Sequence, residues 1–141
     1  MKYTILLATS LLVFACKKEQ PTPEPTTEEK IIGTWKGDKV VYTENEPGQP
    51  QYQEMEDISA YNFIFNAEGT FTVDSAGFDV ENYQWSVSGN DDFIWRYDAN
   101  SADVLTIIQL NNNSFTLQET GTYINSNNVV VPYTDEIKLV R

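Results

Sequence analysis

Apolar and polar residues alternate along most of the chain after residue 32. A repeat of two residues is typical of β-strands that bury one face, because successive side chains of a strand point to opposite sides. The apolar positions of this pattern are Tyr61, Phe63, Phe65, Phe71, Val73, Tyr83, Trp85, Val87, Phe93, Trp95, Tyr97, Phe115, Leu117, Ile137 and Leu139. The pattern predicts eight strands, at residues 33–44, 58–66, 70–74, 81–88, 92–98, 103–110, 114–124 and 129–140.

Short clusters rich in Asn, Gly, Asp and Pro separate these segments, at residues 45–50, 66–69, 89–92, 111–113 and 125–128. Connections of this length favour hairpins between consecutive strands. Consecutive strands with one apolar face must pack against a second sheet or close on themselves, and closure also removes exposed edges. We therefore predict an all-β fold, an eight-stranded up-and-down antiparallel barrel, rather than a sandwich. The strand at 103–110 is apolar on both faces, which predicts an exposed patch near Ile107.

The chain of 141 residues is long enough for one domain, which we place at residues 28–141. Thr26 followed by Glu29 fits a capping box. This spacing predicts a short helical turn at 27–32, just before the first strand.

Residues 1–15 have the organisation of a signal peptide, with a short basic start and an apolar run at 5–15. About eleven residues rise roughly 16 Å as a helix, whereas a bilayer core needs about 20 residues, so we expect removal rather than a membrane span. The run ends in Val13-Phe14-Ala15-Cys16, which resembles the lipobox of bacterial lipoproteins apart from Phe14. The resemblance implies that Cys16 is the lipid-modified first residue of the mature protein. The alternative is a buried thiol in an uncleaved helix.

Residues 16–27 carry the lipid attachment site and a flexible linker. Pro21, Pro23 and Pro25 alternate with polar residues, and no apolar side chain in 17–27 can seed a core. Such segments favour extended polyproline II at about 3.1 Å per residue, so the tether spans up to roughly 34 Å. Its charged start is similar to the export signals of surface lipoproteins of the Bacteroidetes, with a generic solvated spacer as the alternative. We expect a lipid-anchored protein of the outer membrane, on the periplasmic face or at the cell surface.

Nine Lys and Arg against twenty-one Asp and Glu give a formal net charge of -12, and the chain has no His. This charge repels phosphate backbones, so no nucleic-acid partner is expected. The lack of His excludes imidazole-based acid–base chemistry and nucleophile activation. The single Cys excludes an internal disulfide.

Acidic residues cluster at Glu54, Glu56 and Asp57, at Asp91 and Asp92, and at 98–103. None of these clusters has the spacing of a calcium-binding EF-hand loop. None fixes two carboxyl groups at the separation that a glycosidase needs. We therefore interpret them as solvated turn charges, and we expect no metal, no cofactor and no enzymatic activity.

Gly33-Thr34-Trp35, at the start of the first predicted strand, resembles the G-x-W motif of the lipocalin superfamily. The resemblance implies that Trp35 plugs one end of the barrel and that a basic residue of the last strand lies across it. Arg141 is the matching candidate because it shares the phase of Ile137 and Leu139. Lys138 is the alternative partner, and Arg141 is then simply solvated.

The chain as a whole is similar to small lipocalin-like lipoproteins of the Bacteroidetes. The resemblance rests on the lipobox, the F-x-x-x-G-T-F segment at 65–71, Trp85, Trp95 and the terminal KLVR. Asp74-Ser75-Ala76 also matches the tripeptide that these bacteria O-glycosylate on exported proteins, with an ordinary turn as the alternative.

An eight-stranded barrel holds one small ligand or is filled by its own side chains. The inward residues that line a ligand cavity or form the core are Phe63, Phe65, Phe71, Tyr83, Trp85, Phe93, Trp95 and Tyr97. We expect a non-catalytic monomer that binds a small apolar ligand in a narrow or shallow site at the open end. The alternative is an interaction module with a filled barrel, in which loops 45–57 and 75–82 or the patch near Ile107 bind an envelope protein or polysaccharide.

Overall fold

The computed structural model describes residues 23–75 and 78–141, and the predicted signal peptide and Cys16 lie outside this part of the chain. Within it the elements are α1 (Thr27–Ile31), β1 (Gly33–Glu44), β2 (Tyr52–Asp57), β3 (Tyr61–Phe65), β4 (Thr70–Ser75), β5 (Phe78–Ser88), β6 (Asp92–Arg96), β7 (Ala102–Leu110), β8 (Ser114–Ile124) and β9 (Val130–Val140). No helix of the described residues has the length and hydropathy needed to cross a membrane.

The short helix α1 begins at a capping box. The backbone N–H of Glu29 donates to Thr26 Oγ1 at 3.2 Å, and the N–H of Thr26 donates to Glu29 Oε2 at 2.7 Å. These bonds occupy N–H groups that the start of a helix leaves without partners. The predicted helical turn is confirmed, and its last residue, Ile31, is fully buried against the barrel core.

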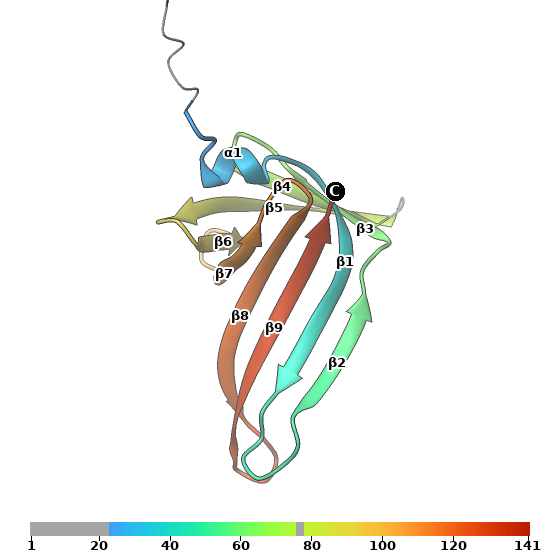
Figure 1. Ribbon diagram of the computed structural model, residues 1–141, viewed down its shortest axis with the longest axis vertical. Helices are drawn as coiled ribbons and strands as arrows, with labels where there is room; N and C mark the ends of the chain where they lie inside the picture. The colour runs from blue at the N-terminus through green and yellow to red at the C-terminus, as the bar shows by residue number, and fades with distance from the viewer. Residues whose placement is uncertain (1–22, 76–77) are drawn as a thin grey trace, which may run out of the picture.

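Eight strands, β1 and β3 to β9, form a closed antiparallel barrel (Figure 1). Neighbouring strands from β3 to β9 pair in chain order, and β9 pairs back to β1 with a register from Lys36↔Val140 to Glu44↔Tyr133. The first part of β1, residues 33–36, pairs with β3 and closes the ring on the other side. The predicted eight-stranded up-and-down barrel is confirmed.

The loop predicted at 45–57 is wrong in its second half. Residues 52–57 form β2, which pairs with residues 39–44 of β1. The same edge of β1 therefore pairs first with β3, at residues 33–36, and then with β2, at residues 39–44. All six residues of β2 are exposed, so no buried apolar face marks this strand in the sequence. β5 also begins earlier than predicted, at Phe78 instead of residue 81.

Aromatic side chains fill the interior of the barrel. Among the described residues, the largest fully buried side chains include Trp35, Phe71, Phe93 and Phe115. The ring of Phe65 lies among them, with its centroid 5.0 Å from Phe71 and 5.9 Å from both Phe93 and Phe115. The pair with Phe71 is stacked and the other two are edge-to-face, and both arrangements stabilise a core beyond the burial of their area. The barrel is therefore held together by ring-to-ring packing.

Four strands continue beyond the closed barrel and form a curved wall at its open end (Figure 1). We call this part the extension; it consists of residues 39–44, 52–57, 119–124 and 130–136. Its strands lie in the order β2, β1, β9, β8. β7 pairs with β8 no further than Gln118, and β3 pairs with β1 no further than Lys36, so neither short strand reaches the extension. α1 lies at the opposite end of the molecule.

Candidate functional site

Trp35 closes the end of the barrel beside α1. Its side chain is fully buried, and its indole N–H donates to the carbonyl oxygen of Ile31 at 2.7 Å. Its ring packs against Phe115, with 5.5 Å between centroids. These contacts fix the helix to the first strand, so the G-x-W segment shapes the closed end.

Arg141 lies over this indole, with its guanidinium carbon 3.9 Å from the centre of the Trp35 ring. Its Nη2 also donates to the carbonyl oxygens of residues 30–32, at 3.3, 3.4 and 2.7 Å. The end of a helix leaves such carbonyls without N–H partners. Gly33, at a φ of 122°, lies close below, where a Cβ would be 3.1 Å from Nη2. Lys138, the alternative partner of the indole, forms an ion pair along β9 instead.

The aromatic residues proposed from sequence to line a cavity or form the core pack together. Five of them are buried core residues: Phe63, Phe65, Phe71, Trp85 and Phe93. Tyr83 and Trp95 are half-buried against this core, and Tyr97 is 46% exposed at the rim. Ring contacts run from Phe71 to Tyr83 and on to Tyr97, at centroid distances of 5.1 and 5.7 Å. The packed core thus reaches the open end as an aromatic floor, formed by Tyr83, Trp95 and Tyr97.

The indole N–H of Trp95 is buried and has no hydrogen-bond partner. Among the described side chains of residues 23–75 and 78–141, it is the only buried nitrogen or oxygen without one. An unpaired buried donor costs about 1–3 kcal/mol.

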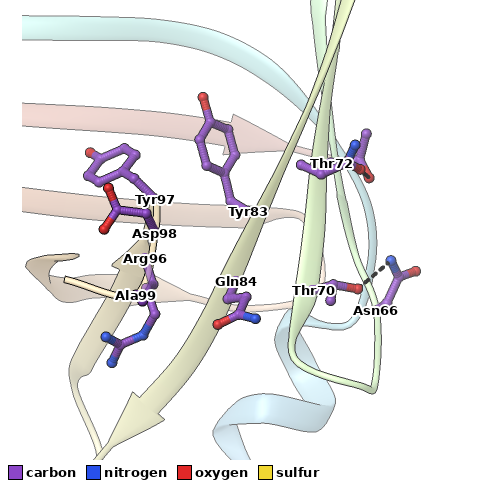
Figure 2. A pocket seen from close by; sticks show the side chains of 10 residues that line it. Asn66, Thr70, Thr72, Tyr83, Gln84, Arg96, Tyr97, Asp98 and Ala99 are labelled. Atoms are coloured by element: carbon purple, nitrogen blue, oxygen red, sulfur yellow. Dashed lines mark hydrogen bonds between the residues drawn. The ribbon is translucent and has the colours of Figure 1, made fainter. Parts of the chain in front are cut away.

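A polar pocket of about 520 Å³ lies beside the floor, where β5 and β6 separate after the pair Gln84↔Arg96. Figure 2 shows the hydroxyls of Tyr83 and Tyr97 on one side of this pocket, with Gln84 and Arg96 pointing the opposite way. The Asp98 carboxylate is engaged in its own turn, where it accepts two backbone N–H groups at 2.7 and 2.9 Å. The lining combines both signs of charge with amides, so no single ligand chemistry dominates it.

The inner face of the extension carries a second pocket, of about 420 Å³. On β9, Asp135 and Tyr133 continue the alternation of the core residues Ile137 and Leu139, so their side chains face this pocket. One row of opposed residues across the four strands is Glu54, Tyr42, Asp135 and Glu119, and the next is Tyr52, Glu44, Tyr133 and Gly121. Tyr123 completes the lining. The strand register therefore brings tyrosines and carboxylates together on one concave face, which we call the mouth pocket.

Tyrosine hydroxyls at the open end are paired with carboxylates. Three of them donate at ordinary distances, Tyr42 to Glu56 at 2.9 Å, Tyr52 to Glu54 at 3.0 Å, and Tyr133 to Glu119 at 3.1 Å. The same pairing occurs at the rim of the short strands, from Tyr83 to Glu81 and from Tyr97 to Asp103. These hydrogen bonds fix the hydroxyl groups beside the carboxylates, and the rings of Tyr42, Tyr52 and Tyr133 line the mouth pocket.

Gly121 makes room for one of these rings. A Cβ at this position would lie 2.6 Å from the Tyr133 hydroxyl oxygen and 2.7 Å from two carbons of its ring. The Tyr133 side chain therefore lies directly on the backbone of β8. Any larger residue at position 121 would push the ring out of this place.

The paired carboxylates keep the tyrosines protonated. The hydrogen bond to Glu56 and burial raise the pKa of Tyr42 to about 12. Burial and the hydrogen bond to Glu81 raise the pKa of Tyr83 to about 12. Both phenol groups therefore stay neutral well above the pH at which a tyrosine usually ionises.

No ion pair within residues 23–75 and 78–141 compensates the negative charge of the mouth pocket. Burial raises the pKa of Asp135 above its usual value, as do the charges of Glu119 and Glu44. Glu119 lies directly opposite Asp135 across β8 and β9, and like charges in this position destabilise a sheet. The salt bridges of the described residues are two, Lys39 with Asp38 and Lys138 with Glu136, and neither involves a carboxylate of the pocket.

The sequence analysis did not identify the mouth pocket. Glu54 and Glu56 are exposed, as expected, but their placement in a turn was wrong, because both lie on β2 and accept tyrosine hydroxyls. The available signal was the phase of Ile137 and Leu139, which continues along β9 to Asp135 and so places an acidic residue on the inward face. Asp91, Asp92 and Asp98 are exposed, as expected.

Two other proposed surfaces are changed by the structure. Ile107 packs against the core, and the exposed apolar residues of β7 are Val104 and Ile108, at 60% and 45%. Most of the loop proposed at 75–82 belongs to β5. Asp74 and Ser75 end β4, and the Ala of the glycosylation tripeptide lies outside the described residues.

A family model described as a lipocalin-like domain matches residues 31–117. The chain belongs to the family of lipocalin-like domains. The match covers the G-x-W segment and most of the barrel, and it ends before the β8 and β9 residues of the extension. Comparison with curated proteins and with solved structures gives no match. Lipocalin-like barrels are generally binding folds without enzymatic activity, which is compatible with a ligand-binding or interaction role.

Proposed function

We propose that this lipocalin-like domain is a non-catalytic binding domain that takes a small ligand at its open end, in the mouth pocket. The observation that carries the proposal is a pocket of about 420 Å³ lined by four tyrosines and three carboxylates, next to a barrel whose interior is filled. A filled interior directs the ligand onto the aromatic floor and the inner face of the extension. This position agrees with the narrow or shallow site at the open end that we expected from the sequence for a small ligand.

The side chains of the mouth pocket are of the kinds that bind small molecules. Tyrosine rings offer rigid apolar contact area, and carboxylates fixed by hydroxyl groups orient polar parts of a ligand. Concave sites of this kind, with aromatic walls and a few placed polar groups, are typical of small-molecule binding.

We also propose that the chain is a lipid-anchored protein of the cell envelope, on the strength of the lipobox-like Val13-Phe14-Ala15-Cys16 and the Pro-rich segment after it. The described chain begins on the α1 side of the barrel, opposite the extension (Figure 1). A tether attached there leaves the mouth pocket facing away from the membrane, where a ligand can reach it. The mass of the mature protein, with Cys16→Ser for comparison, tests the anchor.

Binding at the mouth is testable with probes that share one carbon skeleton and differ in charge. The barrel closes and forms its core within residues 27–141, so residues 23–141 fold as a unit and can be labelled with ¹⁵N. We expect that at least one of 2-phenylethylamine, 2-phenylethanol and phenylacetate shifts amide signals of the extension, Gly121 among them. Gly121→Val should reduce the shifts at least fivefold because it displaces Tyr133, whereas Thr122→Val, on the opposite face of the same strand, should leave them unchanged.

Two results would overturn this proposal. One is the absence of localised shifts at the extension with all three probes. The other is a dansyl-labelled fatty acid that shifts amides around Trp85 and Phe93 and leaves the extension unaffected, because the ligand would then enter the barrel.

A further inference from the structure

We propose that the ligand of the mouth pocket is an organic cation, an ammonium group carried on a small apolar body. The inference rests on the proposed function, since it names the ligand class of the same site. Three features of the pocket carry it: its aromatic walls, its uncompensated negative charge, and its size.

The walls suit a cation because phenol rings attract positive charge through their faces. The mouth pocket is lined by Tyr42, Tyr52, Tyr123 and Tyr133. A cation over an aromatic face is worth about 0.5–1 kcal/mol at exposed sites and about 2 kcal/mol or more when desolvated, and groups of such rings are a known way to hold ammonium ions. A hydroxyl that donates to a carboxylate polarises its ring toward the phenolate, which makes the face more negative. Tyr42, Tyr52 and Tyr133 all donate in this way.

The negative charge of the pocket has no basic partner among the described residues, so a cationic ligand could supply one. Asp135 lies opposite Glu119 in one row, and Glu44 lies in the next. The basic residues of the described part lie elsewhere, on α1, at the closed end or on the outward phase of their strands: Lys30, Lys36, Lys39, Arg96, Lys138 and Arg141. An inward-facing pair of like charges lowers the stability of the sheet, and a bound cation would remove the repulsion.

The dimensions of the pocket favour an organic cation over a metal ion. In the described residues no three acidic or Cys side chains converge closely enough to hold a metal. A volume of about 420 Å³ accommodates an ammonium group together with an apolar body that contacts the tyrosine rings. A neutral ligand would gain the ring contacts but would leave Asp135 and Glu119 in repulsion.

The experiment compares the same three probes by affinity, using residues 23–141 at low ionic strength. We expect 2-phenylethylamine, a cation at neutral pH, to bind about tenfold more tightly than 2-phenylethanol, and phenylacetate to bind least. Added NaCl should weaken binding of the amine and leave that of the alcohol unchanged, because only the charged probe is screened.

Two variants that each remove one negative charge from β9 locate the effect. Asp135→Asn removes it from the inner face, and Glu136→Gln removes it from the next residue, which faces the other way. We expect Asp135→Asn to reduce the affinity for the amine about fivefold and to leave the alcohol unaffected, whereas Glu136→Gln changes neither by more than about twofold.

The outcomes separate this inference from the proposed function. Equal affinity for amine and alcohol at the mouth would overturn the cationic ligand while leaving the binding site in place. Equal losses in Asp135→Asn and Glu136→Gln would also overturn it, because the amine would then respond to net charge alone. Absence of all three probes from the mouth would overturn both proposals.

Discussion

Arg141 stabilises the closed end of the barrel through two kinds of contact at once. Its guanidinium covers the indole of Trp35 and donates three hydrogen bonds to the carbonyl groups at the end of α1. A planar group with several N–H donors can stack and donate together, whereas a lysine ammonium cannot. A single side chain therefore links the last residue of the chain to the helix and to the first strand.

We expect Arg141→Ala to lower the free energy of unfolding by about 1–3 kcal/mol, because it removes the cation–π contact and the hydrogen bonds to the carbonyl oxygens of residues 30–32, of which only that of Ile31 keeps a second donor, the indole N–H of Trp35. Urea denaturation of residues 23–141, followed by tryptophan fluorescence, measures the change. Lys138→Ala is the matched control: its half-exposed ion pair with Glu136 should contribute less than about 1 kcal/mol. Equal losses in the two variants would show that Arg141 acts only as a surface charge.

The closed end and the mouth pocket differ in how far they could be predicted from sequence. Gly33 and Trp35 lie in one short motif, and Arg141 follows from the phase of its own strand. The residues of the mouth pocket come from four strands, and only the register places Tyr42 beside Asp135. Acids and tyrosines at these positions look like ordinary solvated strand residues until the pairing is known.

At the level of elements, the first strand is organised by a change of partner. β1 pairs with β3 up to Lys36 and with β2 from Lys39, and its register against β9 shifts at the same place. Gly37 and Asp38 form this junction: the N–H of Ile58 donates to the carbonyl of Asp38 at 3.2 Å, and the Ile58 side chain enters the core. β2 was not predicted because all of its residues are exposed, and its pairing with β1 depends on this junction.

We expect Gly37→Ala to destabilise the domain by about 2–3 kcal/mol, because the added Cβ would lie 2.1 Å from the carbonyl oxygen of Ile58, a backbone atom that cannot move without shifting the strand. Gly48→Ala separates crowding from backbone strain. That glycine has a φ of 82° and nothing within 4 Å of the added Cβ, so its replacement should cost only about 1 kcal/mol. Urea denaturation of both variants measures the difference, and a smaller loss for Gly37→Ala would contradict the junction described here.

On the scale of the whole molecule, the two ends of the barrel have opposite characters. The closed end joins α1, Trp35 and Arg141 by hydrogen bonds and a cation–π contact. The open end gathers carboxylates without basic partners in the described residues, in a chain whose formal net charge is -12. Stability is therefore concentrated at one end, and the electrostatic repulsion that a ligand could relieve is concentrated at the other.

This division predicts how stability depends on pH. The pKa of Asp135 is raised in the folded protein, so folding favours its protonated form. The stabilisation that this protonated form gives to the fold is present below the usual carboxyl value of 3.8 and is lost as the pH rises through the folded pKa. Asp135→Asn should therefore raise Tm at pH 7, leave it nearly unchanged at pH 3, and gain less in high salt, which screens the repulsion. Asp57→Ala should have the opposite effect, because hydrogen bonds from Ser59 lower the pKa of Asp57. Its stabilising contribution is present above the usual carboxyl value and is lost as the pH falls through the folded pKa, so this substitution should reduce Tm more at pH 7 than at pH 3. Thermal unfolding at the two pH values measures both, and a lower Tm for Asp135→Asn at pH 7 would show that the mouth pocket is not under charge repulsion.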